Sequence, residues 1–406
     1  MFRRIVALWL VVLVLAPAVR GGDGKEGKYE KWPAGRWPFW EQYAAHFIGP
    51  QGRVIEGSEA DRTTSEGQAY ALFFALVGND RLRFDLVLNW TQDNLAGGDL
   101  HKRLPAWKWG HGEDGKWRVL DDNSAADADL WMAYSLLEAS RLWDEPEEYG
   151  ELGKSLLSRI AAEEVADLPG QGPMLLPGRF GFHPVADQWI VNASYIPPPL
   201  LWAAARAQPD GPWKQINEQM ETLVCQGSGS GFAMDWDIYT SGKGYAPTAG
   251  PGGSVASAAN APVPGGSYDA IRVYLWAGLS HNAGLSAAQQ KRQHAGLDCL
   301  GGMATYLDTH ATPPEVVDPS GKVLQPEGTV GFSAALLPYL QLEHRPTAFA
   351  AQHARLESHK NDVLGLYGEN DPRYYDQNLT LFALGWSEQR LAFEPDGKLR
   401  VKWHAN

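Results

Sequence analysis

Three acidic residues of this chain stand where a predicted helix begins. Glu66, Asp127 and Asp269 each follow a loop of polar or small residues and precede an apolar stretch with helical periodicity. Alone, each acid is typical of a residue that caps a helix or complements its dipole. Together, and without a Ser–His or Cys–His arrangement beside them, they indicate chemistry by paired carboxyl groups. Glycoside hydrolysis needs such a pair, since one acid protonates the leaving oxygen while the other activates water or attacks carbon.

The neighbours of the first two acids leave further interpretations open. Gly67 follows Glu66 although glycine is a poor helix residue, which indicates that another group approaches the backbone closely there. Ser124 and Asp127 have the spacing of a capping box. The segment 121–129 holds four Asp residues, more than capping requires, so a divalent metal site is an alternative. The regular ligand spacing of a calcium-binding loop is missing from this segment.

The third acid has a basic partner at helical spacing. Arg272 lies three residues after Asp269, and Ser267 precedes both as a candidate cap. A neighbouring cation favours the ionised carboxylate, so Arg272 is predicted to keep Asp269 charged. The alternative is an ion pair on a helix surface, which contributes little to stability.

A proton donor at a helix start faces the opposite requirement. The helix N-terminus favours the charged form of Glu66, whereas an acid catalyst needs its proton. Burial or a neighbouring carboxylate must outweigh the dipole, and Asp127 is the predicted neighbour.

The elements that must position these acids are mostly helices. About twelve helical segments are expected, with boundaries uncertain by about two to four residues. They span 39–46, 66–77, 81–95, 125–143, 147–162, 195–207, 213–225, 269–279, 287–308, 330–342, 347–364 and 373–391. Six helical hairpins can close into a ring, and an all-α (α/α)6 barrel is therefore predicted. An open solenoid is the competing arrangement, but no repeat of about 34 to 47 residues is found.

Small insertions interrupt the predicted helices. A β-hairpin is expected over residues 107–119, an irregular strip over 180–191, and a loop rich in Gly, Ala and Pro over 227–266. Long loops usually carry function. Because helices of one layer run in the same direction in such a ring, the three acids are expected to meet at one mouth.

Aromatic side chains suggest what this mouth holds. The chain contains 17 Trp, 15 Tyr and 13 Phe, and the apolar faces of pyranose rings stack on such side chains. Trp107, Trp109 and Trp117 lie in a Gly-rich hairpin with polar neighbours, where substrate contact is at least as well supported as packing. Trp131 lies inside a predicted helix, where packing in the core is the competing interpretation.

The segments that carry the acids resemble those of family 8 glycoside hydrolases. The similarity rests on Ala125-Ala126-Asp127-Ala128-Asp129-Leu130-Trp131, Thr64-Ser65-Glu66-Gly67-Gln68, Tyr268-Asp269-Ala270-Ile271-Arg272, Asn192-Ala193-Ser194-Tyr195 and Tyr374-Tyr375-Asp376-Gln377. It covers residues 37–386. It implies an (α/α)6 barrel and inverting hydrolysis of β-1,4-glucan without a metal or other cofactor. It further implies that Glu66 is the proton donor, that Asp269 is the general base, and that Asp127 grips the distorted sugar at the cleavage point.

The resemblance also has consequences beyond the three acids. Tyr195 and Tyr375 resemble tyrosines near the attacking water. Ala126 stands where the family usually has Ser or Thr, and Ala193 replaces a common Pro. The similarity extends to members that accompany bacterial cellulose synthases, which implies a cellulose chain as substrate and the export complex as a partner. The predicted substrate-binding residues are Trp107, Trp109, Trp131, Tyr195, Arg272 and Tyr375.

The N-terminus predicts export. Arg3 and Arg4 precede an apolar run over 5–15 and the small-residue pattern Ala16-Pro17-Ala18, as in a secretory signal peptide. Residues 1–18 are predicted to be removed, leaving a single catalytic domain over 19–406 in the periplasm or outside the cell, without a membrane span. An uncleaved N-terminal anchor is the alternative.

Composition excludes several classes of protein. The chain has 406 residues, of which 44% are hydrophobic and 20% charged, as in globular proteins. Its net charge of −13 argues against a nucleic-acid or anionic-membrane partner. Cys225 and Cys299 allow a single disulfide after export, but neither a disulfide framework nor a zinc site built from cysteine alone.

Three other functions remain as alternatives. The first is a related hydrolase acting on chitosan, xylan or mixed-linkage glucan. The second is a non-catalytic glucan-binding component of the export machinery, in which the acids serve only as caps. The third is a metal-dependent enzyme, although His111, His183 and His281 show no close ligand pairing.

Overall fold

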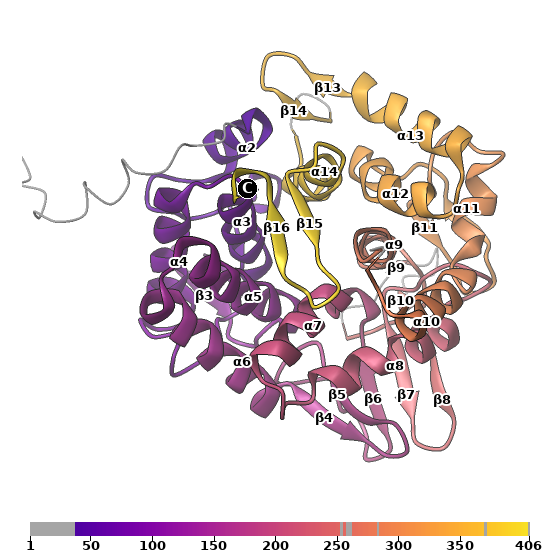
Figure 1. Cartoon of the computed structure of the whole chain (residues 1–406), viewed down its shortest axis with the longest axis horizontal. Helices are drawn as coiled ribbons and strands as arrows, with labels where there is room; N and C mark the ends of the chain where they lie inside the picture. Colours follow the sequence, from indigo (N-terminus) through magenta and orange to yellow (C-terminus); the bar gives the residue numbers. More distant parts are fainter. Residues whose placement is uncertain (1–36, 252–254, 257–261, 282–283, 369–371, 405–406) are drawn as a thin grey trace, which may run out of the picture. The chain divides into compact units, whose positions relative to one another are not determined.

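The computed structural model describes residues 37–404 apart from 252–254, 257–261, 282–283 and 369–371. The predicted signal peptide, residues 1–18, lies outside the described residues. The described helices form two concentric layers (Figure 1). This arrangement confirms the predicted (α/α)6 barrel.

The inner layer consists of helices that are buried on nearly all sides. It comprises α3 (Ser65–Val77), α5 (Ala126–Trp143), α7 (Pro198–Ala207), α9 (Ala270–Leu279), α12 (Val330–Leu342) and α14 (Tyr374–Ser387). The outer helices lie around them, and most bury one face. They are α2 (Pro38–Phe47), α4 (Arg81–Leu95), α6 (Glu151–Glu163), α8 (Trp213–Gly227), α10 (Ala287–Asp298), α11 (Gly301–Leu307) and α13 (Pro346–Ser358). The difference follows from sequence: α3 is apolar all round, whereas α6 buries a single helical stripe.

The centre of the ring is filled by aromatic side chains of the inner helices. Trp131 packs edge-on against Tyr70 and Phe73, and it also contacts Trp276 and Phe382. These rings come from α3, α5, α9 and α14, so the aromatic cluster joins four inner helices. Offset and edge-to-face contacts of this kind add to the stabilisation from apolar burial.

Several predicted helices differ from the observed ones. The segments 347–364 and 373–391 end as helices at Ser358 and Ser387, and strands begin at Lys360 and Leu391. The segment 195–207 becomes helical only at Pro198, because proline suits a first helical turn and restricts the residue before it. The segment 287–308 is two helices, α10 and α11. At the break, the Gly302 N–H donates to the Gly231 carbonyl at 2.9 Å, a backbone approach in which a Cβ would collide.

The insertions contain more strand than predicted. The expected hairpin is β2 (Lys108–His111) with β3 (Trp117–Asp121), and β1 (Thr63–Thr64) pairs with β2. The prediction of a structureless loop over 227–266 is wrong. This segment supplies β7 (Asp237–Thr240) and β8 (Gly244–Pro247), which form an antiparallel sheet with β6 (Gln188–Val191). It also supplies β9 (Val255–Ala256), which pairs with β10 (Pro262–Val263).

The remaining strands form two-stranded hairpins. These are β4 (Val165–Leu168) with β5 (Gly172–Leu175), β11 (Val316–Val317) with β12 (Val323–Gln325), β13 (Lys360–Asn361) with β14 (Leu366–Tyr367), and β15 (Leu391–Phe393) with β16 (Leu399–Val401).

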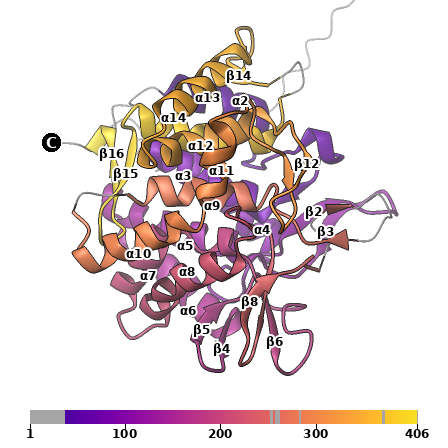
Figure 2. The ribbon, with the colours of Figure 1, turned by 90° about the vertical axis from the view of Figure 1, so that its right-hand side faces the viewer.

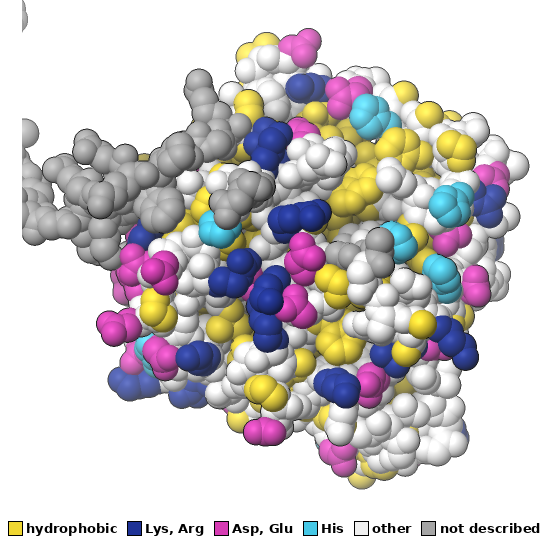
Figure 3. Space-filling view, in the orientation of Figure 1, with side chains coloured by type: hydrophobic (Ala, Val, Ile, Leu, Met, Phe, Trp, Pro, Cys, Tyr) yellow, Lys and Arg dark blue, Asp and Glu magenta, His cyan; other side chains and the backbone are white. Residues whose placement is uncertain are grey.

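The two ends of the barrel carry different strands. Figure 2 shows β15 and β16 at one end and β2, β3 and β12 at the other. The buried Glu138 fixes β16, since it accepts from the Leu399 N–H at 3.0 Å and pairs with Arg141 and Arg206. Acidic and basic side chains are interspersed over the face that carries this hairpin (Figure 3). The β15–β16 hairpin therefore covers one end of the barrel, and a functional site is to be sought at the opposite end.

Two further features concern export and membranes. Cys225 at the end of α8 and Cys299 after α10 form a disulfide. No helix in the described part of the chain combines the length and the apolar character needed to cross a bilayer.

Candidate active site

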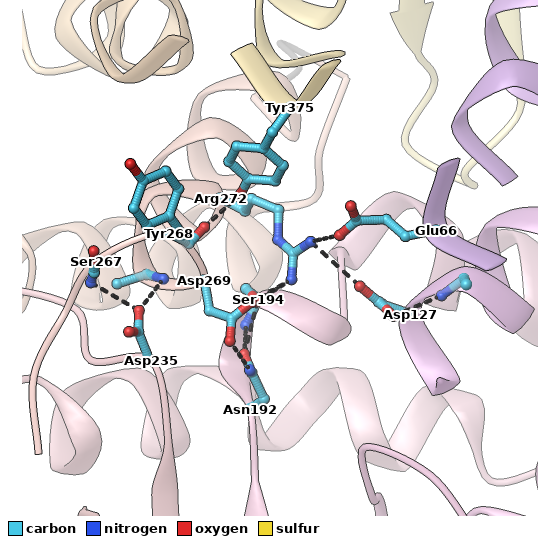
Figure 4. A network of polar contacts seen from close by, with 12 residues as sticks. Glu66, Asp127, Asn192, Ser194, Asp235, Ser267, Tyr268, Asp269, Arg272 and Tyr375 are labelled. Carbon is cyan, nitrogen blue, oxygen red and sulfur yellow. Dashed lines mark hydrogen bonds and ion pairs between the residues drawn. The ribbon is translucent and has the colours of Figure 1, made fainter. Parts of the chain in front are cut away.

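The three predicted acids meet around one guanidinium group. Arg272 Nη2 lies 2.8 Å from Asp269 Oδ1, and Nη1 lies 3.3 Å from Asp127 Oδ2. The same Nη1 donates to Glu66 Oε2. Figure 4 shows Arg272 between Glu66 and Asp127 on one side and Asp269 on the other. The predicted convergence of the acids is thus confirmed, and Arg272 links α3, α5 and α9.

The four side chains differ in their access to solvent. Glu66 and Asp269 are 22% and 25% exposed, whereas Asp127 is 4% and Arg272 is 2% exposed. Glu66 and Asp269 are therefore the more accessible of the four side chains, and Asp127 and Arg272 lie deeper. The predicted contact of Arg272 with substrate stays a prediction. The alternative of a surface ion pair is excluded by the burial of Arg272.

Glu66 is placed by the start of α3. The Thr64 side chain accepts from the Gly67 N–H and so caps the helix. The absence of a side chain at Gly67 lets the ring of Tyr374 approach, since a Cβ there would lie 3.2 Å from it. Tyr374 then donates its hydroxyl to Glu66 Oε1 at 2.7 Å. The close approach predicted from Gly67 is that of Tyr374.

Asp127 lies in the first turn of α5, but without the predicted capping box. Its Oδ1 accepts from the Ala128 N–H at 2.8 Å, and the Ser124 hydroxyl donates to Glu164 instead. Burial has the largest effect on Asp127, and the neighbouring carboxylates of Glu66 and Asp269 act in the same direction. Together they raise the pKa of Asp127 to about 7 against the opposing effect of Arg272.

Asp269 stands at the N-cap position of α9. Asn192 Nδ2 donates to its Oδ2 at 3.1 Å. Burial raises the pKa of Asp269, and the lowering effect of Arg272 does not outweigh it. Arg272 acts in the predicted direction, since it favours the ionised form of Asp269, but burial has the larger effect on the pKa and the nearby Glu66 adds to it.

Asp235 is a site residue that the sequence analysis missed. Its Oδ1 accepts from the N–H groups of Ser267 and Ala270, at 2.7 and 2.8 Å, so it caps α9 in place of the predicted Ser267. Burial raises the pKa of Asp235 to about 7, and Asp269 adds to this effect. Asp235 belongs to the segment 227–266, and no local spacing relates it to α9.

Two tyrosines and a serine complete the surroundings of Arg272. The guanidinium lies 5.4 Å from the ring centre of Tyr195, and its Nη2 donates to Ser194 Oγ at 3.0 Å. Tyr375 donates its hydroxyl to the Tyr268 carbonyl, just before Asp269. The structure thus places the predicted Tyr195 and Tyr375 beside the acids, both partly exposed.

The tryptophans separate into two groups. Trp109 and Trp117 stack with their ring centres 4.9 Å apart, and Arg53 lies 4.4 Å from each ring. Trp117 is 45% exposed, and Trp107 is partly exposed beside Lys108. Trp131 is 1% exposed, so its predicted substrate contact is wrong and it packs in the core. Trp117 thus presents the more accessible apolar surface.

The arrangement has the groups required for acid–base catalysis. Two partly exposed carboxyl groups, those of Glu66 and Asp269, pair with the same buried guanidinium. Within the described residues, no three or more His, Cys, Asp or Glu side chains are grouped in a way that could hold a metal ion.

Comparisons with known proteins point to one family. Residues 31–389 match the model of the glycosyl hydrolases family 8. An endoglucanase of Escherichia coli O157:H7 is 43% identical over 371 residues, covering 90% of this chain and 91% of the relative. An endoglucanase of Xanthomonas axonopodis pv. citri is also 43% identical, covering 91% and 90%.

Solved structures agree with these relatives. The crystal structure of an endo-1,4-D-glucanase from Vibrio fischeri ES114 is similar with a TM-score of 0.79 at 36% identity. The similarity covers 91% of this chain and 100% of that one.

Proposed function

The chain belongs to glycosyl hydrolase family 8 and is a glycoside hydrolase, and we propose that it is an endo-β-1,4-glucanase that inverts the anomeric centre. The observation that carries this proposal is the set of three carboxyl groups around Arg272, with Glu66 and Asp269 open to solvent. The endoglucanase relatives at 43% identity support glucan as the substrate class.

In the proposed mechanism, Glu66 and Asp269 act from opposite sides of the glycosidic bond. Glu66 gives its proton to the leaving oxygen as that bond breaks. Asp269 takes a proton from water as the water oxygen forms the new bond to the anomeric carbon. Asp127 receives hydrogen bonds from the sugar at the cleavage point and favours its distorted form.

The site can retain a proton at mildly acidic pH. Burial raises the pKa values of both Asp127 and Asp269. In a coupled cluster the proton belongs to the group as a whole rather than to one residue.

Carboxymethylcellulose hydrolysis tests the activity and the roles. We expect Glu66→Gln and Asp269→Asn to lower kcat by about 10²–10⁴ while both proteins stay folded by circular dichroism. Normal activity of Glu66→Gln would refute its assignment. NMR of fresh products tests stereochemistry: an inverting enzyme first releases the α-anomer from a β-glucan, and early release of the β-anomer would contradict inversion.

A substrate panel distinguishes glucan from the alternatives. Carboxymethylcellulose, chitosan, xylan and mixed-linkage glucan are compared by kcat/KM. We expect the β-1,4-glucan to be the best substrate. A higher value on another polymer would reassign the substrate, and binding without hydrolysis would favour a non-catalytic glucan-binding component.

We further propose that the enzyme acts in the periplasm or outside the cell on cellulose leaving its synthase. The basic and apolar pattern of residues 1–18 and the pairing of Cys225 with Cys299 support export. Cell fractionation with N-terminal mass spectrometry tests this location. Intact residues 1–18 on a cytoplasmic protein would refute it. Co-purification with the synthase tests the proposed partner.

A further inference from the structure

Asp129, the second acid of the Asp127-Ala128-Asp129 motif, takes no part in the contacts of Arg272. Its side chain is fully buried, and its carboxyl group lies within hydrogen-bond reach of Glu164, which follows α6 and is 1% exposed. Two carboxyl groups that are both buried and in contact require a physical explanation, since ionised carboxylates repel each other and only accept hydrogen bonds.

The donors around the pair are too few for two carboxylates. The Ser124 hydroxyl donates to Glu164 Oε1. No other protein donor in the described part of the chain reaches Glu164 Oε2 or either oxygen of Asp129. A proton held between the two carboxyl groups supplies the missing donor. Burial raises the pKa of Asp129, and it raises that of Glu164 to about 8.

The acidic neighbours of the pair favour this proton, and one cation opposes it. Arg179 is the cation that faces both carboxyl groups, and it lowers their pKa values. Asp127 raises the pKa of Asp129, and Glu163 raises that of Glu164. Arg179 is itself shared, since its Nη1 lies 3.9 Å from Glu163 and its Nη2 donates to a backbone carbonyl.

The pair lies where several segments join the start of α5. Leu176 N–H donates to the Glu164 carbonyl at 2.8 Å, and Ala126 N–H donates to the Pro177 carbonyl at 3.0 Å. The Arg179 N–H donates to Ser124 Oγ at 3.2 Å. These bonds hold Ser124 and Ala126, which precede Asp127. The position of the Asp127 carboxyl group therefore depends on the Asp129–Glu164 pair.

We propose that Asp129 and Glu164 share one proton and, through Ser124, act as positioning residues that hold the start of α5 and so place Asp127 against Arg272. The activity readout of this inference rests on the role proposed for Asp127. The dependence of Tm on pH does not rest on that role, so the shared proton and the proposed function can be refuted independently.

Amide variants test the proton itself. Glu164→Gln and Asp129→Asn each replace a carboxyl group by an amide of the same size, whose N–H donor does not titrate. In the wild type the raised pKa of Glu164 gives stability that is fully present below its ordinary pKa of 4.5 and is lost as pH rises to about 8. We expect the difference in Tm between either amide variant and the wild type to increase in favour of the variant by about 3–8 °C from pH 5 to pH 8.5.

A neighbouring substitution provides the control. Asp167→Asn makes the same charge change at an exposed position of β4, three residues after Glu164, and we expect its Tm to follow the wild type at every pH. If the wild type and both amide variants show the same dependence of Tm on pH, no proton is shared and the proposal is overturned. The two amide variants are independent, so a folding failure of one leaves the other as the test.

Activity tests the positioning role. At pH 6 we expect Glu164→Ala to lower kcat on carboxymethylcellulose by about 10- to 100-fold with little change in KM, because Ser124 loses its acceptor. Glu164→Gln is expected to restore kcat to within about three-fold of the wild type. Unchanged kcat in a folded Glu164→Ala protein would refute the positioning role while leaving the shared proton to the Tm test.

Discussion

Asp235 Oδ1 lies 2.8 Å from the backbone nitrogen of Ala270, at the start of the helix that carries Arg272. A residue of the segment before β7 thus caps α9 and lies beside Asp269. The inserted segment 227–266 therefore belongs to the active site as well as to the β6–β7–β8 sheet.

Removing this cap should weaken both stability and catalysis. We expect Asp235→Ala to lower the free energy of unfolding by about 1–2 kcal/mol, because two N–H groups lose their acceptor. We expect kcat to fall as well, since Asp269 moves with the helix start. Asp235→Asn keeps an acceptor oxygen and should retain most of the stability. Urea titrations measure the free energy of unfolding and initial rates measure kcat. Equal losses of stability in Asp235→Ala and Asp235→Asn would contradict the capping role.

The shared guanidinium should control the acid limb of the pH profile. Arg272 lowers the pKa values of Asp127 and Asp269. Arg272→Met therefore raises the pKa of the proposed base, and the acid limb of kcat/KM should move up by at least about one pH unit. Arg272→Lys keeps the positive charge but loses the forked guanidinium group. We therefore expect kcat/KM to fall by about 10²–10³ and the acid limb to move less than in Arg272→Met. An unchanged limb in a folded Arg272→Met protein would refute this coupling.

The raised pKa of Asp127 predicts a specific dependence of stability on pH. Protonation of Asp127 favours the folded state, so its contribution is full below the ordinary pKa of 3.8 and is lost as pH rises to about 7. Asp127→Asn does not titrate. We expect its unfolding free energy to rise relative to the wild type across this range, by up to about 4 kcal/mol. Urea unfolding at a series of pH values measures the difference, and parallel curves would contradict it.

Two tryptophans should respond differently to truncation. Trp117 is 45% exposed, so Trp117→Ala should raise KM on long glucans several-fold with little loss of stability. Trp131 is 1% exposed within the aromatic core, so Trp131→Ala should cost about 3–5 kcal/mol of stability. Thermal unfolding and steady-state kinetics on both variants distinguish the roles. A large loss of Tm in Trp117→Ala would argue against a role of Trp117 in substrate binding.

The disulfide should stabilise the α8–α10 side of the barrel. Its cysteines are 74 residues apart in sequence, and closing a loop of that length contributes about 4 kcal/mol through the unfolded state. We expect Cys225→Ser with Cys299→Ser to lower Tm while kcat at 25 °C stays within about two-fold. Equal Tm values for the oxidised wild type and the double variant would refute this contribution.

Local sequence patterns were enough to predict most of the helices and the catalytic candidates. Apolar periodicity over 81–95 and 330–342 predicted two helices with their observed boundaries. Three acids at helix starts predicted a common mouth, because helices of one layer begin at one end of a barrel. These signals are local, and spacing along the chain suffices to detect them.

Only the tertiary structure decided how each residue is used. Arg272 is shared among three carboxyl groups, Trp131 is buried in the core while Trp117 is exposed, and Asp235 rather than Ser267 caps α9. In each case the deciding partner comes from a segment far away in sequence. Burial and the pKa values that depend on it are properties of the packed barrel, so residues of the same type and local pattern acquire different roles.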